Sequence, residues 1–177
     1  MTKKYEITES GRIRALIDLP QRGVKRGDEG GFIGSEANLS HLGGAWVSGN
    51  AWVSGNARVY GDAWVYGNAQ VSGNARVYEN AQIYGNARVY SNARVPGNAR
   101  VSGNARVSRS LIVLTGFKHT LTITDHHVRA GCEQHSPSVW IDRGRAIIRA
   151  HGNSLGDAES WYGIIVSLIK AHGCTDA

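Results

Sequence analysis

The sequence predicts a mainly β protein, built as a solenoid of stacked repeats with a small α+β domain at its C-terminal end. From residue 45 to residue 108 the motif Ala-x-Val-x-Gly-Asn recurs every six residues without an insertion. An α-helix needs an apolar period near 3.6, which this motif does not supply. Each hexad instead places its apolar residues two apart and then turns at Gly-Asn, as a very short strand would. One such strand cannot bury its apolar face alone, whereas stacked copies can.

Each hexad has an inward and an outward side. Ala51 and Val53 point to one side of the strand, whereas Trp52 and Ser54 point to the other. We therefore expect the Val or Ile of every hexad in the core, where full burial of one such side chain contributes roughly 1.5–3 kcal/mol. The predicted core series, in which each member has an Ala two residues earlier, is Val47, Val53, Val59, Val65, Val71, Val77, Ile83, Val89, Val95, Val101 and Val107.

The regular array is preceded by a less regular segment. Residues 1–30 are predicted to form an N-terminal cap, and residues 31–109 to form the solenoid itself. Within the cap, residues 5–7 and 12–18 show the alternation of short strands. The loop at 40–44 adds two residues before the regular hexads begin. A cap is physically expected here, because an uncovered strand edge at the end of a solenoid invites association.

Residues 110–177 have a different composition and are predicted to form the α+β domain. The runs at 111–115 and 120–124 are rich in β-branched residues and favour strands, and 128–130 is a candidate third strand. Ser136-Pro137 is typical of a helix start.

Two helices are expected in this domain. The first runs from Pro137 to about Ala150 and closes at His151-Gly152. The second covers 157–171, where apolar residues recur at helical spacing.

The charge balance of the chain is basic. The formal net charge is +6, and the array alone holds six Arg and no Lys against Asp62 and Glu79. Such an excess favours anionic partners, although the same charges also serve solubility. The planar fork of Arg suits phosphate groups and aromatic rings better than the Lys ammonium does.

Several features point to a cytoplasmic protein. The two cysteines, Cys132 and Cys174, are too few for a disulfide scaffold and favour a reducing compartment. The first twenty residues lack the apolar core of a signal peptide. No stretch reaches the ~20 apolar residues that a membrane span needs, so a membrane partner is not expected.

The repeat resembles the hexapeptide repeat of left-handed parallel β-helix proteins, in which three hexads form one triangular coil. The opening segments RIRAL, GGFI and EANLS resemble a group of such proteins in phages, prophages and bacteria. Many of these are labelled as acyltransferases or polymer-forming proteins without a demonstrated activity. The resemblance covers about residues 5–110. It implies a left-handed parallel β-helix, a homotrimer, and the stacking of residues that are 18 apart.

This stacking would create three outer faces with different side chains. One face would carry Trp46 and Trp64, and we expect it to form the subunit contact, because exposed tryptophans make an adhesive patch. Another face would carry an alternation of cations and rings that can pair with phosphate and stack on a base. Its members are Arg58, Tyr60, Arg76, Tyr78 and Arg94.

Catalytic and metal sites are weakly indicated. Acyltransferases of the hexapeptide class use a histidine base, but the regular array contains no His, and His41 in the starting loop is the nearest candidate. Cys132 and His135 are zinc-type ligands, yet their spacing matches no strong zinc signature. We therefore predict no catalytic residue, no metal and no cofactor.

The function predicted from these observations is binding without catalysis. The chain would be a phage-like trimer that binds or sequesters an anionic, nucleotide-like small molecule, with a nucleotide signal of host defence as the suggested ligand. Two alternatives stay open: a CoA-dependent hexapeptide acyltransferase, and a structural or protein-binding scaffold that inhibits a host protein. A phage-encoded chain would act in the host cytoplasm, and nucleic acid is not an expected partner. The predicted ligand-binding residues are Arg58, Tyr60, Arg76, Tyr78, Arg94, His126 and His135.

Overall fold

The chain divides into two compact units. The computed structural model describes residues 3–115, 119–152 and 154–176. Unit 1 is Met1–Ser110 and contains the hexad array, and unit 2 is Leu111–Ala177. The predicted mainly β solenoid and the C-terminal α+β region are both confirmed.

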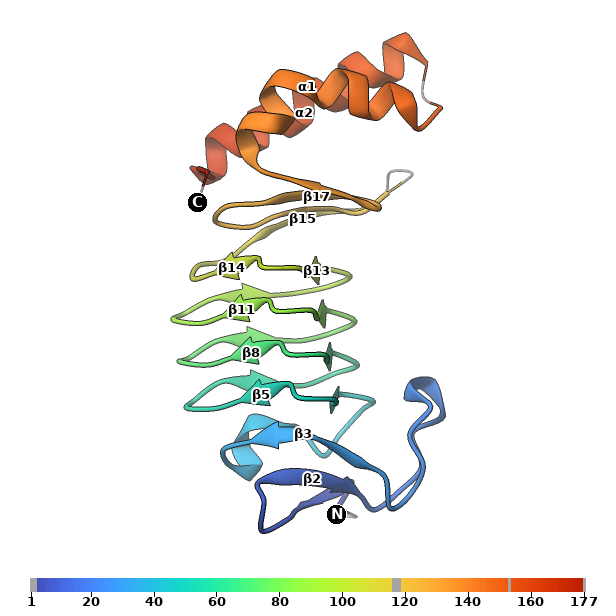
Figure 1. Ribbon diagram of the computed structural model, residues 1–177, viewed down its shortest axis with the longest axis vertical. Helices are drawn as coiled ribbons and strands as arrows, with labels where there is room; N and C mark the ends of the chain where they lie inside the picture. The colour runs from blue at the N-terminus through green and yellow to red at the C-terminus, as the bar shows by residue number, and fades with distance from the viewer. Residues whose placement is uncertain (1–2, 116–118, 153, 177) are drawn as a thin grey trace. The chain divides into compact units, whose positions relative to one another are not determined.

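The hexad array forms a parallel β-solenoid of about four coils, in which every strand is two residues long (Figure 1). The strands make three parallel faces. The first face consists of β4 (Trp46–Val47), β7 (Trp64–Val65), β10 (Gln82–Ile83) and β13 (Arg100–Val101). The second includes β5 (Trp52–Val53), β8 (Gln70–Val71), β11 (Arg88–Val89) and β14 (Arg106–Val107). The third consists of β6 (Arg58–Val59), β9 (Arg76–Val77) and β12 (Arg94–Val95).

The register between coils is 18 residues, as expected. Arg58 pairs with Arg76, and Arg76 pairs with Arg94. The outward residue that follows each Ala donates its backbone N–H to the Ala carbonyl one coil further on, as in the 2.9 Å bond from Arg58 N to Ala75 O. The outward Ser or Tyr donates to the Val or Ile carbonyl, as in the 3.0 Å bond from Tyr60 N to Val77 O. All eleven predicted core Val and Ile residues are at most 1% exposed.

The N-terminal cap continues the second face of the solenoid. The strands β1 (Tyr5–Ile7), β2 (Arg12–Ala15) and β3 (Glu29–Ile33) pair antiparallel, and β3 then pairs parallel with β5. Two short 3-10 helices, η1 (Pro20–Arg22) and η2 (Glu36–Asn38), complete this region. The cap thus supplies hydrogen-bond partners to the first coil.

A buried polar cluster holds the cap to the start of the solenoid. Lys4 is 1% exposed, and its ammonium donates to the carbonyls of Ala45 at 2.7 Å and Gly43 at 3.3 Å. The fully buried Tyr5 donates its hydroxyl to Leu39 O at 2.7 Å. The Lys4 ammonium and the Tyr5 hydroxyl therefore each have a partner, which offsets the cost of removing them from water.

The first face is not open where the sequence suggested a subunit contact. Trp46 is only 1% exposed within its own chain, and Trp64 is partly buried. The segment around η1 lies against this face: Arg22 places its guanidinium 5.3 Å from the Trp64 ring and donates to Gly44 O at 3.2 Å. The expected exposure of Trp46 is therefore wrong, because its own chain covers it. The subunit contact at this face stays a prediction.

Unit 2 combines a four-stranded antiparallel sheet with two helices. The strands, in sheet order, are β15 (Ile112–Leu114), β16 (Leu121–Ile123), β17 (Val128–Ala130) and β18 (Glu133–His135). The sequence did not predict β18, because Glu-Gln-His contains none of the residues that favour strands, which are Val, Ile, Thr, Phe, Tyr and Trp. The helices are α1 (Pro137–Ala150) and α2 (Leu155–His172). Helix α2 begins two residues before the expected start because Ser154 caps it, accepting the Asp157 N–H at 3.2 Å.

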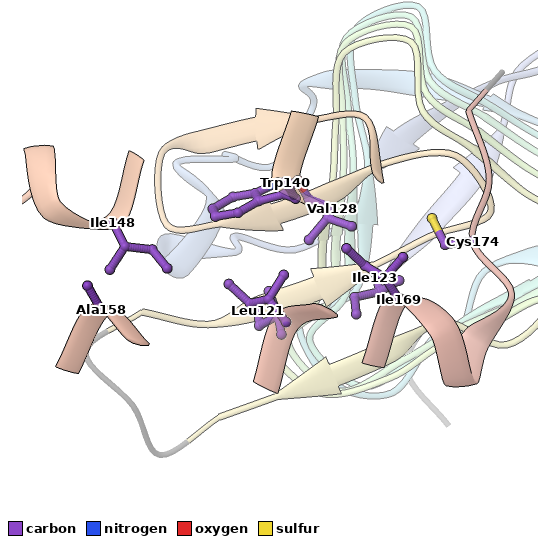
Figure 2. Close-up of a cluster of buried hydrophobic side chains, with 9 residues drawn as sticks. Leu121, Ile123, Val128, Trp140, Ile148, Ala158, Ile169 and Cys174 are labelled. Carbon is purple, nitrogen blue, oxygen red and sulfur yellow. The ribbon is translucent and has the colours of Figure 1, made fainter. Parts of the chain in front are cut away.

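Apolar side chains from the sheet and both helices form the core of unit 2 (Figure 2). Trp140 of α1 lies beside Val128 of β17, and its indole N–H donates to the Val128 carbonyl at 2.8 Å. The cluster consists of Leu121, Ile123, Val128, Trp140, Ile148, Ala158, Ile165, Ile169 and Cys174.

Because the coils stack closely, replacing two different turn glycines should destabilise the fold by different amounts. Gly73 and Gly97 have φ values of +67° and +60°, where an L-residue costs about 1–2 kcal/mol. A Cβ at Gly73 would also lie 2.8 Å from the Ser91 N of the next coil, whereas at Gly97 the nearest atom is Glu79 Oε2 at 3.5 Å. We expect Gly97→Ala to cost about 1 kcal/mol and Gly73→Ala about 2–4 kcal/mol in urea unfolding. Equal losses would contradict the close stacking.

The buried Lys4 makes stability depend on pH. Burial lowers the pKa of its ammonium from 10.5 to about 8, although the Asp62 carboxylate partly opposes this shift. Between these two values the unfolded chain holds a proton that the folded chain has released, so the free energy of unfolding rises with pH. Burial raises the pKa of the Tyr5 hydroxyl, which has the opposite effect above about pH 10.

We therefore expect the wild-type chain to gain about 1 kcal/mol relative to Lys4→Met between pH 8 and about pH 9.5. The measurement is urea unfolding of both chains at intervals across this range. The difference in the free energy of unfolding between the two chains reports the titration of Lys4, because both chains contain every other titrating group. Parallel stability curves would show that the Lys4 ammonium is not destabilised by its burial.

Candidate functional site

The third face of the solenoid carries three parallel columns of outward side chains, which we call the arginine face. An exposed column of arginines follows β6, β9 and β12, with Asn on one side and mainly Tyr on the other. The members are Asn56, Asn74 and Asn92; Arg58, Arg76 and Arg94; and Tyr60, Tyr78 and Pro96. The Asn amides form a ladder, with bonds of 3.2 Å from Asn56 to Asn74 and 3.1 Å from Asn74 to Asn92.

The arginine column lacks acidic partners. Among the described residues, no carboxylate lies within ion-pair distance of Arg58, Arg76 or Arg94. Arg14 in the cap is different, because it lies 3.6 Å from Glu6 and 3.5 Å from Glu29. Neighbouring strands of a sheet are about 4.8 Å apart, so the three guanidinium groups repel one another through solvent. An anion bound along the column would relieve this repulsion.

The arginine face is hollowed at its N-terminal end. There the segment of η2 and the loop after it borders a hollow of about 540 Å³, which we call the cap hollow. It is lined by Glu36, Ala37, Leu39, Ser40, His41, Arg58, Val59, Tyr60 and Arg76. A second furrow of about 390 Å³ lies between the Asn and Arg columns. Arg58 and Arg76 line both depressions, so they stand at the centre of the candidate site.

Tyr60 and Tyr78 stack on each other along their column. Their ring centroids are 5.2 Å apart and the rings are nearly parallel, at 7°. This spacing is too small for another ring to enter between them, because two stacked contacts would need about twice the separation of one. A planar group can therefore contact only an outer face of the pair. Tyr60 lines the cap hollow and offers such a surface there.

The acidic group at the rim of the cap hollow is already paired. Glu36 Oε1 lies 2.6 Å from Lys3 Nζ, and this hydrogen bond lowers the pKa of the Glu36 carboxyl. His41 lies near the same carboxylate, with Nε2 at 3.8 Å from Oε1. The pairing with Lys3 reduces the repulsion that Glu36 would exert on an incoming anion.

His41 is held by the cap rather than presented as a base. Its Nδ1 accepts the Lys4 backbone N–H at 3.1 Å, and its ring stacks on Tyr5 with centroids 4.3 Å apart. The Nε2 atom is buried and has no hydrogen-bond partner among the described residues. Although the ring lines the cap hollow, this orientation gives no support to an acyltransferase mechanism that uses His41.

The two predicted histidines of the site belong to unit 2, not to the arginine face. His126 Nδ1 lies 3.0 Å from Thr175 O, and His135 Nε2 lies 2.6 Å from Glu133 Oε2. They contact different partners, so the structure does not join them into one site. The five predicted residues on the solenoid do share one face.

Sequence reasoning missed a cluster in unit 2 that contains Glu133 and His151. Glu133 Oε1 lies 2.9 Å from His151 Nε2, while Oε2 lies against His135. The hydrogen bonds from His151 and His135 lower the pKa of the Glu133 carboxyl. Cys132 completes the cluster, which borders a cavity of about 50 Å³. The sequence signal that pointed to this region was the pair Cys132 and His135, whose residue types suit zinc.

The comparisons with known proteins concern the repeat. A family model described as "YdcK Beta solenoid repeat" matches residues 51–67, 69–81, 81–97 and 99–114. These segments begin 18, 12 and 18 residues apart, which are whole numbers of hexads. They cover less than half of the chain. No curated protein and no solved structure matches the chain significantly. None of the helices in the described ranges has the length and apolar character to cross a bilayer.

The match and the three parallel sheets agree on the architecture. The chain carries a β-solenoid repeat that is similar to the YdcK repeat, and it adds a cap before the repeat and an α+β unit after it. Phage origin and membership of the hexapeptide-repeat group stay predictions from the resemblance.

Proposed function

We propose that the arginine face binds a small anion that carries a phosphate group and a planar ring, as nucleotides do. The observation that carries the proposal is the column of Arg58, Arg76 and Arg94, which has no acidic partner among the described residues and borders the cap hollow. The proposed role is binding or sequestration, without a catalytic step.

The phosphate would lie on the arginine column. A guanidinium pairs with phosphate oxygens through two parallel hydrogen bonds, and charge-assisted bonds of this kind are roughly twice as strong as neutral ones. Two successive arginines can contact one phosphate chain, because their strands are neighbours at about 4.8 Å. The Asn amides beside them offer further N–H donors.

The planar ring would occupy the cap hollow. Its volume of about 540 Å³ lies within the range of small-molecule sites, about 300–1,000 Å³. The outer face of Tyr60 supplies a stacking surface, and stacking of a base on an aromatic side chain is worth about 1–3 kcal/mol. A nucleotide would then use both the cationic column and the hollow at its end.

A homotrimer and a cytoplasmic location belong to the same proposal. The trimer is implied by the resemblance, and the first coil of the second face offers an exposed aromatic pair for it. There Trp52 is 51% exposed and stacks on Phe32, with ring centroids 5.6 Å apart. The cytoplasm suits a chain that has only two cysteines, Cys132 and Cys174.

Replacing Arg76 should weaken ligand binding. The probes are ATP, AMP and inorganic pyrophosphate, titrated by calorimetry at about 0.1 M salt, where the Debye length is about 10 Å. Loss of a charge-assisted pair costs about 1.5–3 kcal/mol, so Arg76→Ala should bind ATP about 10- to 100-fold more weakly.

The matched control is Arg88→Ala on the second face. Arg88 has the same position in its hexad as Arg76 and is also exposed. Its replacement by Ala therefore removes the same charge from an equivalent position. Its effect should stay within about threefold, because charges beyond about 8–10 Å are screened. Equal weakening in both variants would mean that net charge, rather than this face, attracts the ligand.

Tyr60→Ala should remove the preference for a ring-bearing anion. We expect wild-type protein to bind ATP more tightly than pyrophosphate, and the variant to lose about tenfold for ATP but little for pyrophosphate. Tyr90→Ala, which alters an exposed tyrosine of the second face, is the control. If wild-type protein binds both probes equally, the ring has no site on this face.

The same titrations, together with a titration of CoA and an acetyl-CoA turnover assay, separate the alternatives. Binding of CoA with turnover of acetyl-CoA would favour an acyltransferase. Absence of binding for every anion would favour a scaffold that contacts another protein.

A further inference from the structure

Three metal-ligand side chains come together at the turn between β17 and β18 and at the end of α1. Cys132 and Glu133 stand at the hairpin turn, and His151 is the C-cap residue of α1. One ligand atom from each lies within 4.8 Å of the other two. All three residues belong to unit 2 and also line its cavity of about 50 Å³.

The donor set consists of one thiolate sulfur, one carboxylate oxygen and one imidazole nitrogen. Zinc accepts all three kinds of ligand, at about 2.3 Å from sulfur and about 2.0–2.2 Å from nitrogen or oxygen. Hard cations such as magnesium prefer oxygen ligands and are disfavoured by the sulfur. Because Glu133 Oε1 already lies 2.9 Å from His151 Nε2, an ion would replace that hydrogen bond with little rearrangement.

A second histidine orients the carboxylate. His135 Nε2 lies 2.6 Å from Glu133 Oε2, so the other oxygen of the same carboxylate is left for the metal. The His135 ring is itself held edge-on to Trp140, with centroids 5.9 Å apart. Supporting contacts of this kind are typical around protein metal sites.

We propose that Cys132, Glu133 and His151 bind one zinc ion, with His135 as a positioning residue. The three protein ligands leave a fourth position for water or a small ligand, as in zinc sites that are not purely structural. The neighbouring cavity has apolar walls that include Ile147, Trp161 and Ile165. The site is independent of the arginine face and of the ligand proposed there.

The test uses the full, untagged chain, reduced and freed of metal with a chelator, and zinc alone as the probe. Competition with a chromophoric chelator should show one zinc per chain. Cys132→Ser and His151→Ala should each weaken zinc binding by at least about a hundredfold, because each removes a direct ligand. His135→Ala should weaken it by about 10- to 100-fold, as loss of an orienting partner does.

The matched control is His126→Ala, which removes an imidazole of the same unit that contacts Thr175 O instead. It should keep the wild-type zinc affinity. Zinc should also raise the unfolding temperature of the wild-type chain, because it binds only the folded site. Failure of the wild-type chain to bind zinc, or an unchanged affinity in Cys132→Ser, would overturn the proposal.

A second measurement needs no variant. Zinc should slow the alkylation of Cys132, which is exposed, in peptide mapping by mass spectrometry. Cys174 is buried and lies outside the cluster, so zinc should slow its reaction only through the greater stability of the fold, and by a smaller factor than for Cys132. Equal alkylation of Cys132 with and without zinc would contradict ligation by its thiolate.

Discussion

The backbone hydrogen bonds between successive coils are the constraint on which unit 1 depends. The Arg58 N–H donates to Ala75 O and the Arg76 N–H to Ala93 O, each at 2.9 Å. Bonds of this kind fix the register at 18 residues, so each residue stacks on the residue at the same hexad position in the next coil. The inward Val and Ala residues then form a continuous core, and the outward residues form straight columns. The cap satisfies the same constraint at the first coil, where β3 pairs with β5.

Stacking has opposite consequences for different side chains. The Asn and Tyr columns are self-complementary, because an amide can donate to the amide above it and a ring can lie flat on the next ring. An Arg column has no such complement, since guanidinium groups only donate and carry equal charge. The solenoid therefore satisfies the Asn and Tyr columns internally and leaves the arginines available for an anion.

The repeated part of the fold could be predicted because every hexad has the same pattern of inward, outward and turn residues. The register, the core series and the residues that share the arginine face follow from the period. Contacts of the unrepeated segments could not be predicted. Trp46 is buried within its own chain, and Arg22 of η1 donates to Gly44 O across 22 residues of sequence. Glu133 and His151 meet only because α1 ends beside the β17–β18 turn. Their separation of 18 residues in the sequence does not predict this contact.

The same distinction explains where selectivity of the proposed site must arise. Along the column, Arg76 has nearly the same neighbours as Arg58. A uniform row of arginines therefore attracts anions in general, but it neither selects one anion over another nor fixes where the anion binds. The repeat is broken after η2, where the loop at 40–44 adds two residues before the regular hexads. His41 of this loop lines the cap hollow together with Tyr60. Only this end of the face has a shape that differs from the rest. A ligand that uses the arginines would therefore gain its specificity at the cap hollow, and changes there should alter ligand choice more than changes at Arg94.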